Sequence, residues 1–152
     1  MPSDFDFLFG RWAVTHRRLK ERHVGGDDWL EFKGVVTCEP RLDGVVNVEE
    51  HRREGQPFGF ALRTFDLKAR RWSIYWVNPA EGLLQAPVHG RFDNGVGMFE
   101  GDDVDGGRPI RARYVWSQIK ANSARWAQAF SLDGGATWET NWVMDFVRSE
   151  AV

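Results

Sequence analysis

Apolar and polar side chains alternate with a period of two along almost the whole chain, and turn-forming residues interrupt the alternation at short intervals. Sequences such as Asp93-Asn94-Gly95 and Asp133-Gly134-Gly135 separate the runs, and these residue types adopt the positive φ angles that hairpins need. Helical spacing is confined to residues 3–9, where Ser3 can cap a short turn. The pattern predicts an all-β meander in which each strand pairs with its sequence neighbour.

About ten runs qualify as strands. They span residues 11–22, 29–39, 45–53, 58–65, 71–77, 87–92, 96–101, 108–118, 123–132 and 137–148. An antiparallel sheet of this size has exposed edges unless it closes or folds into a sandwich, and the short connections favour an up-and-down barrel over the sandwich. We therefore expect residues 1–152 to form one domain, a single antiparallel barrel that begins with a short helical turn.

Charge and cysteine content exclude several classes of function. The chain has 20 basic and 22 acidic residues and a formal net charge of -2, so no overall field draws it to nucleic acid or to an anionic membrane. Its single cysteine, Cys38, cannot form an internal disulfide. The N-terminal residues lack the pattern of a signal peptide. We expect a cytoplasmic protein with no nucleic-acid partner and no membrane partner.

Gly10-Arg11-Trp12, at the start of the first long run, resembles the G-x-W signature of the calycin superfamily. In calycins the glycine admits a sharp entry into the barrel and the tryptophan plugs its closed end. Longer stretches resemble a family of bacterial domains of unknown function with a calycin-like, lipocalin-like barrel; they cover residues 5–12, 71–76, 106–110 and 130–142. The resemblance implies a barrel like those in which fatty-acid-binding proteins and nitrobindins hold an apolar ligand.

Metal and haem sites receive little support from the sequence. The histidines are His16, His23, His51 and His89. Their spacing fits no metal-binding motif, and the acidic run at residues 102–107 lacks the glutamate of a calcium loop. Nitrobindin-like proteins place their haem-ligating histidine near the C-terminus, whereas these four lie in the first two-thirds of the chain. We expect no metal and no cofactor.

Period-two parity assigns the side chains of each strand to one of two faces. If Trp12 plugs the barrel, His16 and Arg18 share its face and look into the cavity. Similar stripes in later strands bring aromatic and amide groups to the same interior. The predicted ligand-binding residues are Trp12, His16, Arg18, Trp76, Asn78, Tyr114, Trp126, Gln128 and Trp142. Such stripes also suit a packed core, so both interpretations stay open.

Two further faces carry polar groups. The last strand is expected to turn Trp138, Thr140, Trp142, Met144 and Phe146 inward and to leave Asn141 on the other face. In the third strand Glu49 and His51 share a face about 7 Å apart. Such a pair can shuttle a proton, but we favour a solvated outer face beside Arg53.

Residues 131–138 resemble the Asp-box, a structural hairpin of sialidase propellers whose aspartate and serine satisfy turn backbone groups. They imply no glycosidase.

The leading hypothesis is binding of a small hydrophobic or aromatic molecule inside an aromatic-lined barrel. One alternative is a small decarboxylase-like or isomerase-like enzyme that uses the cavity for acid–base chemistry, with His16 or Glu49 as the ionisable group. Another is a barrel filled by its own side chains whose outer aromatic residues form a dimer face. A homodimer is compatible with all three, because the chain has more aromatic residues than one barrel interior can take. No catalytic residue is predicted.

Overall fold

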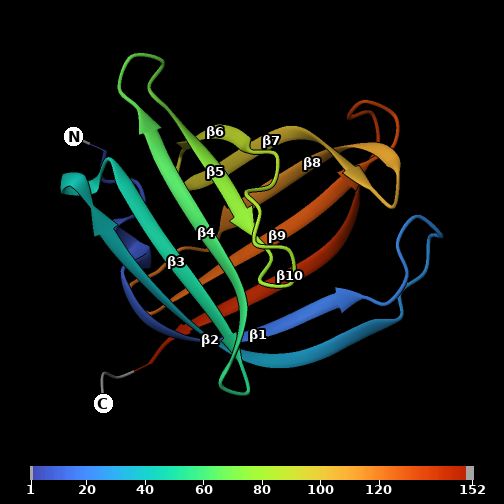
Figure 1. Cartoon of the computed structure of the whole chain (residues 1–152), viewed down its shortest axis with the longest axis horizontal. Coiled ribbons are helices and arrows are strands. Elements are labelled where there is room, and N and C mark those ends of the chain that lie inside the picture. The colour runs from blue at the N-terminus through green and yellow to red at the C-terminus, as the bar shows by residue number, and fades with distance from the viewer. Residues whose placement is uncertain (1, 150–152) are drawn as a thin grey trace.

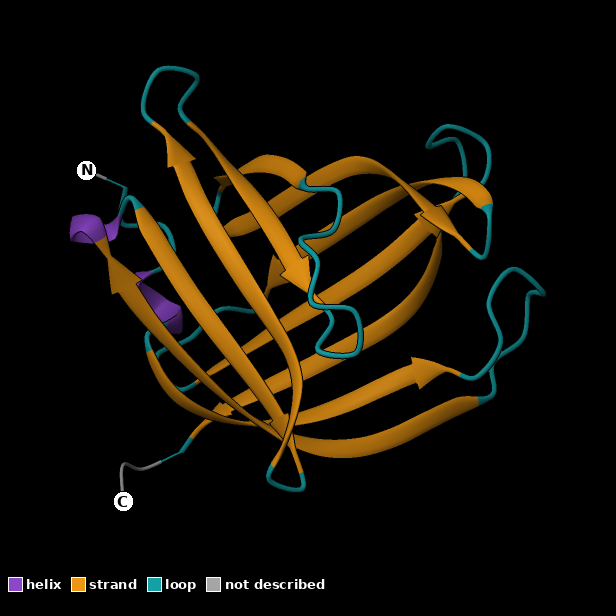
Figure 2. Ribbon diagram, in the orientation of Figure 1, coloured by secondary structure: helices purple, strands orange, loops and turns teal. Residues whose placement is uncertain are grey.

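A computed structural model describes residues 2–149. Its strands are β1 (Gly10–Leu19), β2 (Trp29–Arg41), β3 (Val46–Arg53), β4 (Gln56–Asp66), β5 (Arg71–Val77), β6 (Val88–Asp93), β7 (Val96–Asp105), β8 (Arg108–Ser117), β9 (Ser123–Ser131) and β10 (Glu139–Arg148). Two 3₁₀ turns, η1 (Asp6–Leu8) and η2 (Leu42–Gly44), lie at the same end of the structure (Figure 2). Each helical turn is three residues long, so no helix within residues 2–149 can cross a bilayer.

The strands close into a barrel, as Figure 1 shows. Every strand pairs antiparallel with its sequence neighbour, and β1 also pairs with β10. The closing ladder sets Trp12 opposite Arg148 and Arg18 opposite Trp142. Closure removes both sheet edges, which is the physical reason that a meander of this length curls round. The predicted all-β, antiparallel, up-and-down barrel is confirmed.

The end of the barrel that contains η1, here called the closed end, is sealed by the chain itself. Phe5, Leu8 and Trp12 are fully buried there. The indole N–H of Trp12 donates to the carbonyl of Leu8 at 2.8 Å. Gly10 has a φ of 116°, a conformation that L side chains rarely adopt. Trp12 and the residues before it therefore close this end of the barrel, and the positive φ of Gly10 lets the chain turn into β1.

Several strand boundaries differ from the sequence prediction. β7 continues to Asp105 instead of ending at residue 101, because its acidic run pairs with β8 and sets Asp102 opposite Arg111. Opposite charges across a ladder stabilise the pairing. β1 ends at Leu19 instead of residue 22, and the chain reverses after it at His23, whose φ is 69°.

The opposite end of the barrel, here called the mouth, is formed by loops of unequal length. The connection after β5 is the long, irregular segment 78–87 (Figure 1). This segment joins β5 to β6, and the ladder between these two strands is short. It has three residue pairs: Trp72–Gly90, Ser73–His89 and Ile74–Val88. This loop contributes Asn78, Glu81 and Gln85 to the lining of the cavity at the mouth.

Candidate ligand-binding site at the barrel mouth

A cavity of about 340 Å³, here called the main lobe, opens at the mouth. Its aromatic walls come from β5, β8, β9 and β10, and they consist of Trp76, Tyr114, Trp126, Phe130 and Trp142. Nine polar or charged residues complete the lining: Arg18, Arg22, Asn78, Glu81, Gln85, Asp103, Asp105, Gln128 and Asn141. The volume lies in the range of small-molecule sites.

Seven of the nine predicted ligand-binding residues line the main lobe. These are Arg18, Trp76, Asn78, Tyr114, Trp126, Gln128 and Trp142. Parity predicted these residues because alternate side chains of β1, β5, β8 and β9 face the same interior. Trp12 and His16 do not line it: Trp12 belongs to the closed end, and His16 lies below the cavity with 1% of its surface exposed. A ligand-binding role for any of the nine residues stays a prediction.

His16 contacts the wall of the main lobe through a hydrogen bond with Trp142. Its Nδ1 accepts a hydrogen bond from the indole N–H of Trp142 at 3.1 Å, and its ring stacks on Phe32 at 4.4 Å between centroids. Burial, and after it the charge of His51, lowers the pKa of His16 to about 3. His16 is therefore neutral at pH 7. With Nδ1 as acceptor, its single proton sits on Nε2.

A second cavity of about 300 Å³, here called the side lobe, adjoins the main lobe. The two share Arg18, Trp76, Asn78 and Trp142, and the side lobe adds Pro57, Phe58, Pro79 and Ala80. The guanidinium carbon of Arg18 lies 4.4 Å from the centroid of the Trp142 ring. This cation–π stack therefore forms part of the wall of both lobes.

Asn141 is a lining residue that the sequence analysis missed. It was assigned to the outer face, yet only 4% of it is exposed, and Thr140, expected inside, is exposed instead. A register shift between Thr140 and Trp142 explains the error, since a β-bulge breaks the period-two rule. The Oδ1 of Asn141 accepts from the Nε2 of Gln128 at 2.8 Å, while its buried Nδ2 has no partner within residues 2–149.

Trp138, also expected inside, lies on the loop before β10. The guanidinium carbon of Arg113 lies 4.1 Å from its ring centroid, and its indole N–H donates to the carbonyl of Gly135. In the same loop Asp133 accepts hydrogen bonds from the backbone N–H and the hydroxyl of Thr137. The Asp-box-like segment is thus a structural hairpin, as the sequence predicts.

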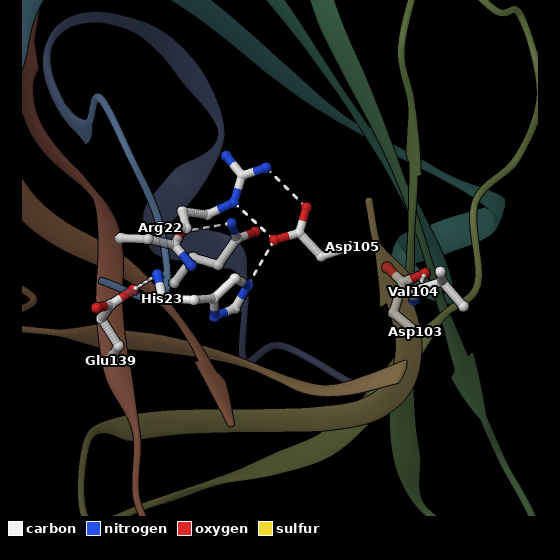
Figure 3. Close-up of polar contacts among 8 residues, drawn as sticks. Arg22, His23, Asp103, Val104, Asp105 and Glu139 are labelled. Carbon is white, nitrogen blue, oxygen red and sulfur yellow. Dashed lines mark hydrogen bonds and ion pairs between the residues drawn. The ribbon is translucent and has the colours of Figure 1, made fainter. Parts of the chain in front are cut away.

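The rim of the mouth is clasped by charged residues from distant parts of the chain (Figure 3). Arg22 donates two hydrogen bonds to Asp105 at 2.7 and 2.8 Å, and the His23 ring lies 2.8 Å from the same carboxylate. Glu139 accepts from the backbone N–H of His23. The hydrogen bond from Arg22 is the main cause that lowers the pKa of Asp105 to about 2. We call Arg22, His23 and Asp105 the rim clasp.

The acidic run before the β7–β8 turn forms the end of β7, which pairs with β8. Among residues 2–149 there is no group of three or more histidine, cysteine, aspartate or glutamate side chains that could hold a metal ion.

A buried polar network fills the barrel between the two ends. Glu49 accepts a short hydrogen bond from Arg63 and pairs with His51, and Arg63 donates to the Oδ1 of Asn47 at 2.9 Å. Glu49 and His51 are 3% and 1% exposed. Burial alone would raise the pKa of Glu49, but the charges of Arg63 and then His51 hold it at about 2. The prediction that this pair faces solvent is wrong.

Arg63 is the reason that Glu49 faces inward. A buried carboxylate needs a charged partner, and Arg63 reaches it from β4 while its guanidinium lies 4.7 Å from the Phe5 ring. Arg63 shares parity with Ala61 and Phe65, which are buried. An arginine on an otherwise apolar stripe was the signal that could have identified the network.

The sequence matches no family model and no curated protein. A solved structure does resemble the chain: the crystal structure of Rv2717c from M. tuberculosis has a TM-score of 0.57 and 11% sequence identity, and the match covers 99% of each chain. At this identity the similarity extends to the fold alone, because unrelated functions share folds.

Proposed function

We propose that this chain binds a small, mostly apolar or aromatic molecule in the main lobe at the mouth of its barrel. The observation that carries the proposal is a cavity of about 340 Å³ with aromatic walls, at the open end of a barrel whose other end is sealed. Barrels of this size can hold one small ligand. A calycin-like relationship is part of the proposal, and the arrangement of Gly10 and Trp12 supports it.

The polar groups of the main lobe give the bound molecule an orientation. Asn141 presents a buried N–H₂ group that has no acceptor within the described chain, while its oxygen is taken by Gln128. An unsatisfied buried donor costs on the order of 1–3 kcal/mol. A ligand with a carbonyl or ether oxygen at this point would remove that cost, so we expect a mostly apolar molecule with at least one acceptor.

Binding is favoured over acid–base catalysis by the pKa values of the candidate groups. Acid–base catalysts work best when their pKa lies near the operating pH. The pKa of His16 is about 3 and that of Glu49 is about 2, so both are weak bases that take up no proton at neutral pH. Glu49 is also engaged by Arg63. His16 and Glu49 therefore suit structural roles, in the hydrogen bond to Trp142 and the ion pair with Arg63.

The proposal is tested by titrating the protein with N-phenyl-1-naphthylamine, a neutral dye that fluoresces in apolar surroundings. We expect a saturable increase in fluorescence. Ala112→Phe should abolish it, because Ala112 is 3% exposed and lines the main lobe. Ala13→Phe, which adds the same ring on the exposed outer face of β1, is the control.

Circular dichroism and urea denaturation establish that both variants are folded. A wild-type protein that gives no saturable signal would overturn the proposal, and so would a folded Ala112→Phe variant with unchanged affinity. Bound dye should also quench tryptophan fluorescence, since Trp76, Trp126 and Trp142 line the site.

A further inference from the structure

We infer that the side lobe is an anion subsite, in which Arg18 binds the carboxylate of an aromatic carboxylic acid. The inference rests on the proposed function and specifies the chemical class of its ligand. Both lobes share the Arg18–Trp142 wall, so a molecule seated at the mouth reaches this arginine.

Arg18 is the one charged side chain among the described residues that line the side lobe. Several other arginines are paired, for example Arg22 with Asp105 and Arg125 with Asp145. Within residues 2–149, no carboxylate lies within 4.0 Å of the Arg18 guanidinium. A half-buried cation without a counter-ion is costly, and an anionic ligand would offset that cost.

The surroundings of Arg18 add to its excess of positive charge. Burial lowers the pKa of Arg18, and the nearby charges of Arg22 and Arg53 lower it further. Arg53 itself stacks on Phe32 at 4.0 Å and has no carboxylate within 4.0 Å in the described chain. Two cations without counter-ions therefore act on the region around the side lobe, and an anion there gains from both.

The geometry of the stack suits a carboxylate. Trp142 covers one face of the guanidinium, and such stacking leaves the N–H groups in the plane of the fork free to bind two oxygens side by side. His16 holds the indole of Trp142 in place by their hydrogen bond. Asn78 accepts from the backbone N–H of Ala80 with its Oδ1 at 2.9 Å, which leaves its own N–H₂ group as a second donor.

The remaining walls select an aromatic acid. Phe58, Trp76 and Trp142 provide flat apolar surfaces, and Pro57 and Pro79 close the lobe without adding backbone donors. The volume of about 300 Å³ suits a molecule of one or two rings. The main lobe, by contrast, adds the carboxylates of Glu81 and Asp103, while its Asp105 is paired with Arg22. Glu81 and Asp103 have no cation within 4.0 Å in the described chain and repel an anion, so charge directs the acid group to the side lobe and the neutral end to the main lobe.

The test compares 2-naphthoate with 2-naphthamide, a pair of nearly equal shape that differs in charge. Isothermal titration of the wild-type protein at pH 7 and low salt should show naphthoate binding at least about tenfold more tightly, the usual size of a charge-assisted hydrogen-bonded pair. Arg18→Gln should remove this preference and leave the affinity for naphthamide within about twofold. Arg18→Lys should restore part of it, because it keeps the charge but loses the fork.

The matched control is Arg53→Gln, which removes an equal charge nearby from a residue that is absent from the lining of both lobes. It should retain most of the preference for naphthoate. Asn78→Leu, a second variant that leaves Arg18 in place, should weaken naphthoate about threefold and naphthamide less.

Each outcome has one meaning. Equal binding of the two probes by the wild-type protein overturns the anion subsite and leaves the proposed function standing, and this measurement needs no variant. A folded Arg18→Gln protein that still prefers naphthoate overturns it as well. If neither probe and no neutral dye binds, the proposed function itself fails.

Discussion

The ladder between β1 and β10 carries an arginine–tryptophan pair at each end of the barrel, and the two pairs differ in what meets the guanidinium. Arg148 stacks over Trp12 at 4.2 Å and Arg18 over Trp142 at 4.4 Å. At the closed end the N–H groups of Arg148 donate to the carbonyls of Phe7 and Phe9. At the mouth the guanidinium of Arg18 donates to no protein acceptor within residues 2–149.

The same residue types are therefore used for stability at one end and left available at the other. At the closed end, the backbone carbonyls of Phe7 and Phe9 accept the hydrogen bonds of Arg148. These donors therefore need no ligand. The mouth keeps a cation, a buried amide and two cavities. Polar groups that line a cavity and have no hydrogen-bond partner in the protein can be satisfied by a bound ligand.

The largest effect is expected from breaking the closed end. Trp12→Ala should lower the free energy of unfolding by about 3–5 kcal/mol, because it leaves a cavity beneath a fully buried indole and frees the Leu8 carbonyl. Trp12→Phe, which keeps most of the volume, should cost clearly less. Urea denaturation measures both. A loss below about 1 kcal/mol for Trp12→Ala would contradict the view that the plug stabilises the barrel.

The next effect concerns the polar network between the two ends. Glu49→Gln should cost roughly 3–5 kcal/mol, because it leaves Arg63 buried without its counter-ion. The pKa of Glu49 is held at about 2, below its ordinary value of 4.5. Its contribution to stability is therefore fully present above about pH 4.5 and is lost as the pH falls toward 2.

Urea titrations from pH 7 to pH 2.5 check this dependence. The wild-type protein should lose stability more steeply with acid than Glu49→Gln does below pH 4.5. Parallel curves for the two proteins would mean that Glu49 is not the titrating group. Glu50→Gln, on the exposed face of β3, is the control.

A direct comparison of the two pairs gives a smaller difference. Arg148→Gln should cost about 2 kcal/mol, since it removes charge-assisted hydrogen bonds to the plug. Arg18→Gln should cost less than about 1 kcal/mol, because it removes the stack on Trp142 but no carboxylate or carbonyl partner within the described chain. Equal losses of stability for the two variants would mean that the arginine–tryptophan pair at the closed end is no more important for folding than the pair at the mouth.

The smallest effect belongs to the rim clasp. Asp105→Asn should cost about 1 kcal/mol, because the ion pair with Arg22 lies at a partly exposed rim. The amides of residues 20–28 should exchange faster with solvent hydrogen. Asp102→Asn, at a side chain that is 90% exposed, is the control and should leave exchange in this loop unchanged. Unaltered exchange in Asp105→Asn would mean that the clasp does not restrain the loop.

The fold could be predicted because alternation and turn residues act locally, and closure follows from the need to remove edges. Most of the mouth could be predicted for the same reason. Asn141 could not, since it is the extra residue of the bulge between Thr140 and Trp142 and is buried beside Trp142. Glu49 and His51 were wrongly predicted to face solvent. Their burial depends on an ion pair with Arg63 on a different strand, and such a contact leaves no pattern in the local sequence.

Closure of β1 onto β10 also has a consequence for biogenesis. The indole of Trp12 and the stripe that follows it cannot be fully covered until residues near 148, which face them in the ladder, have left the ribosome. Contacts that join such distant parts of a chain form slowly, because the intervening loop must first be closed at a cost in entropy. During synthesis this apolar surface stays exposed to solvent, and exposed apolar surface of this kind makes an incomplete chain prone to aggregation.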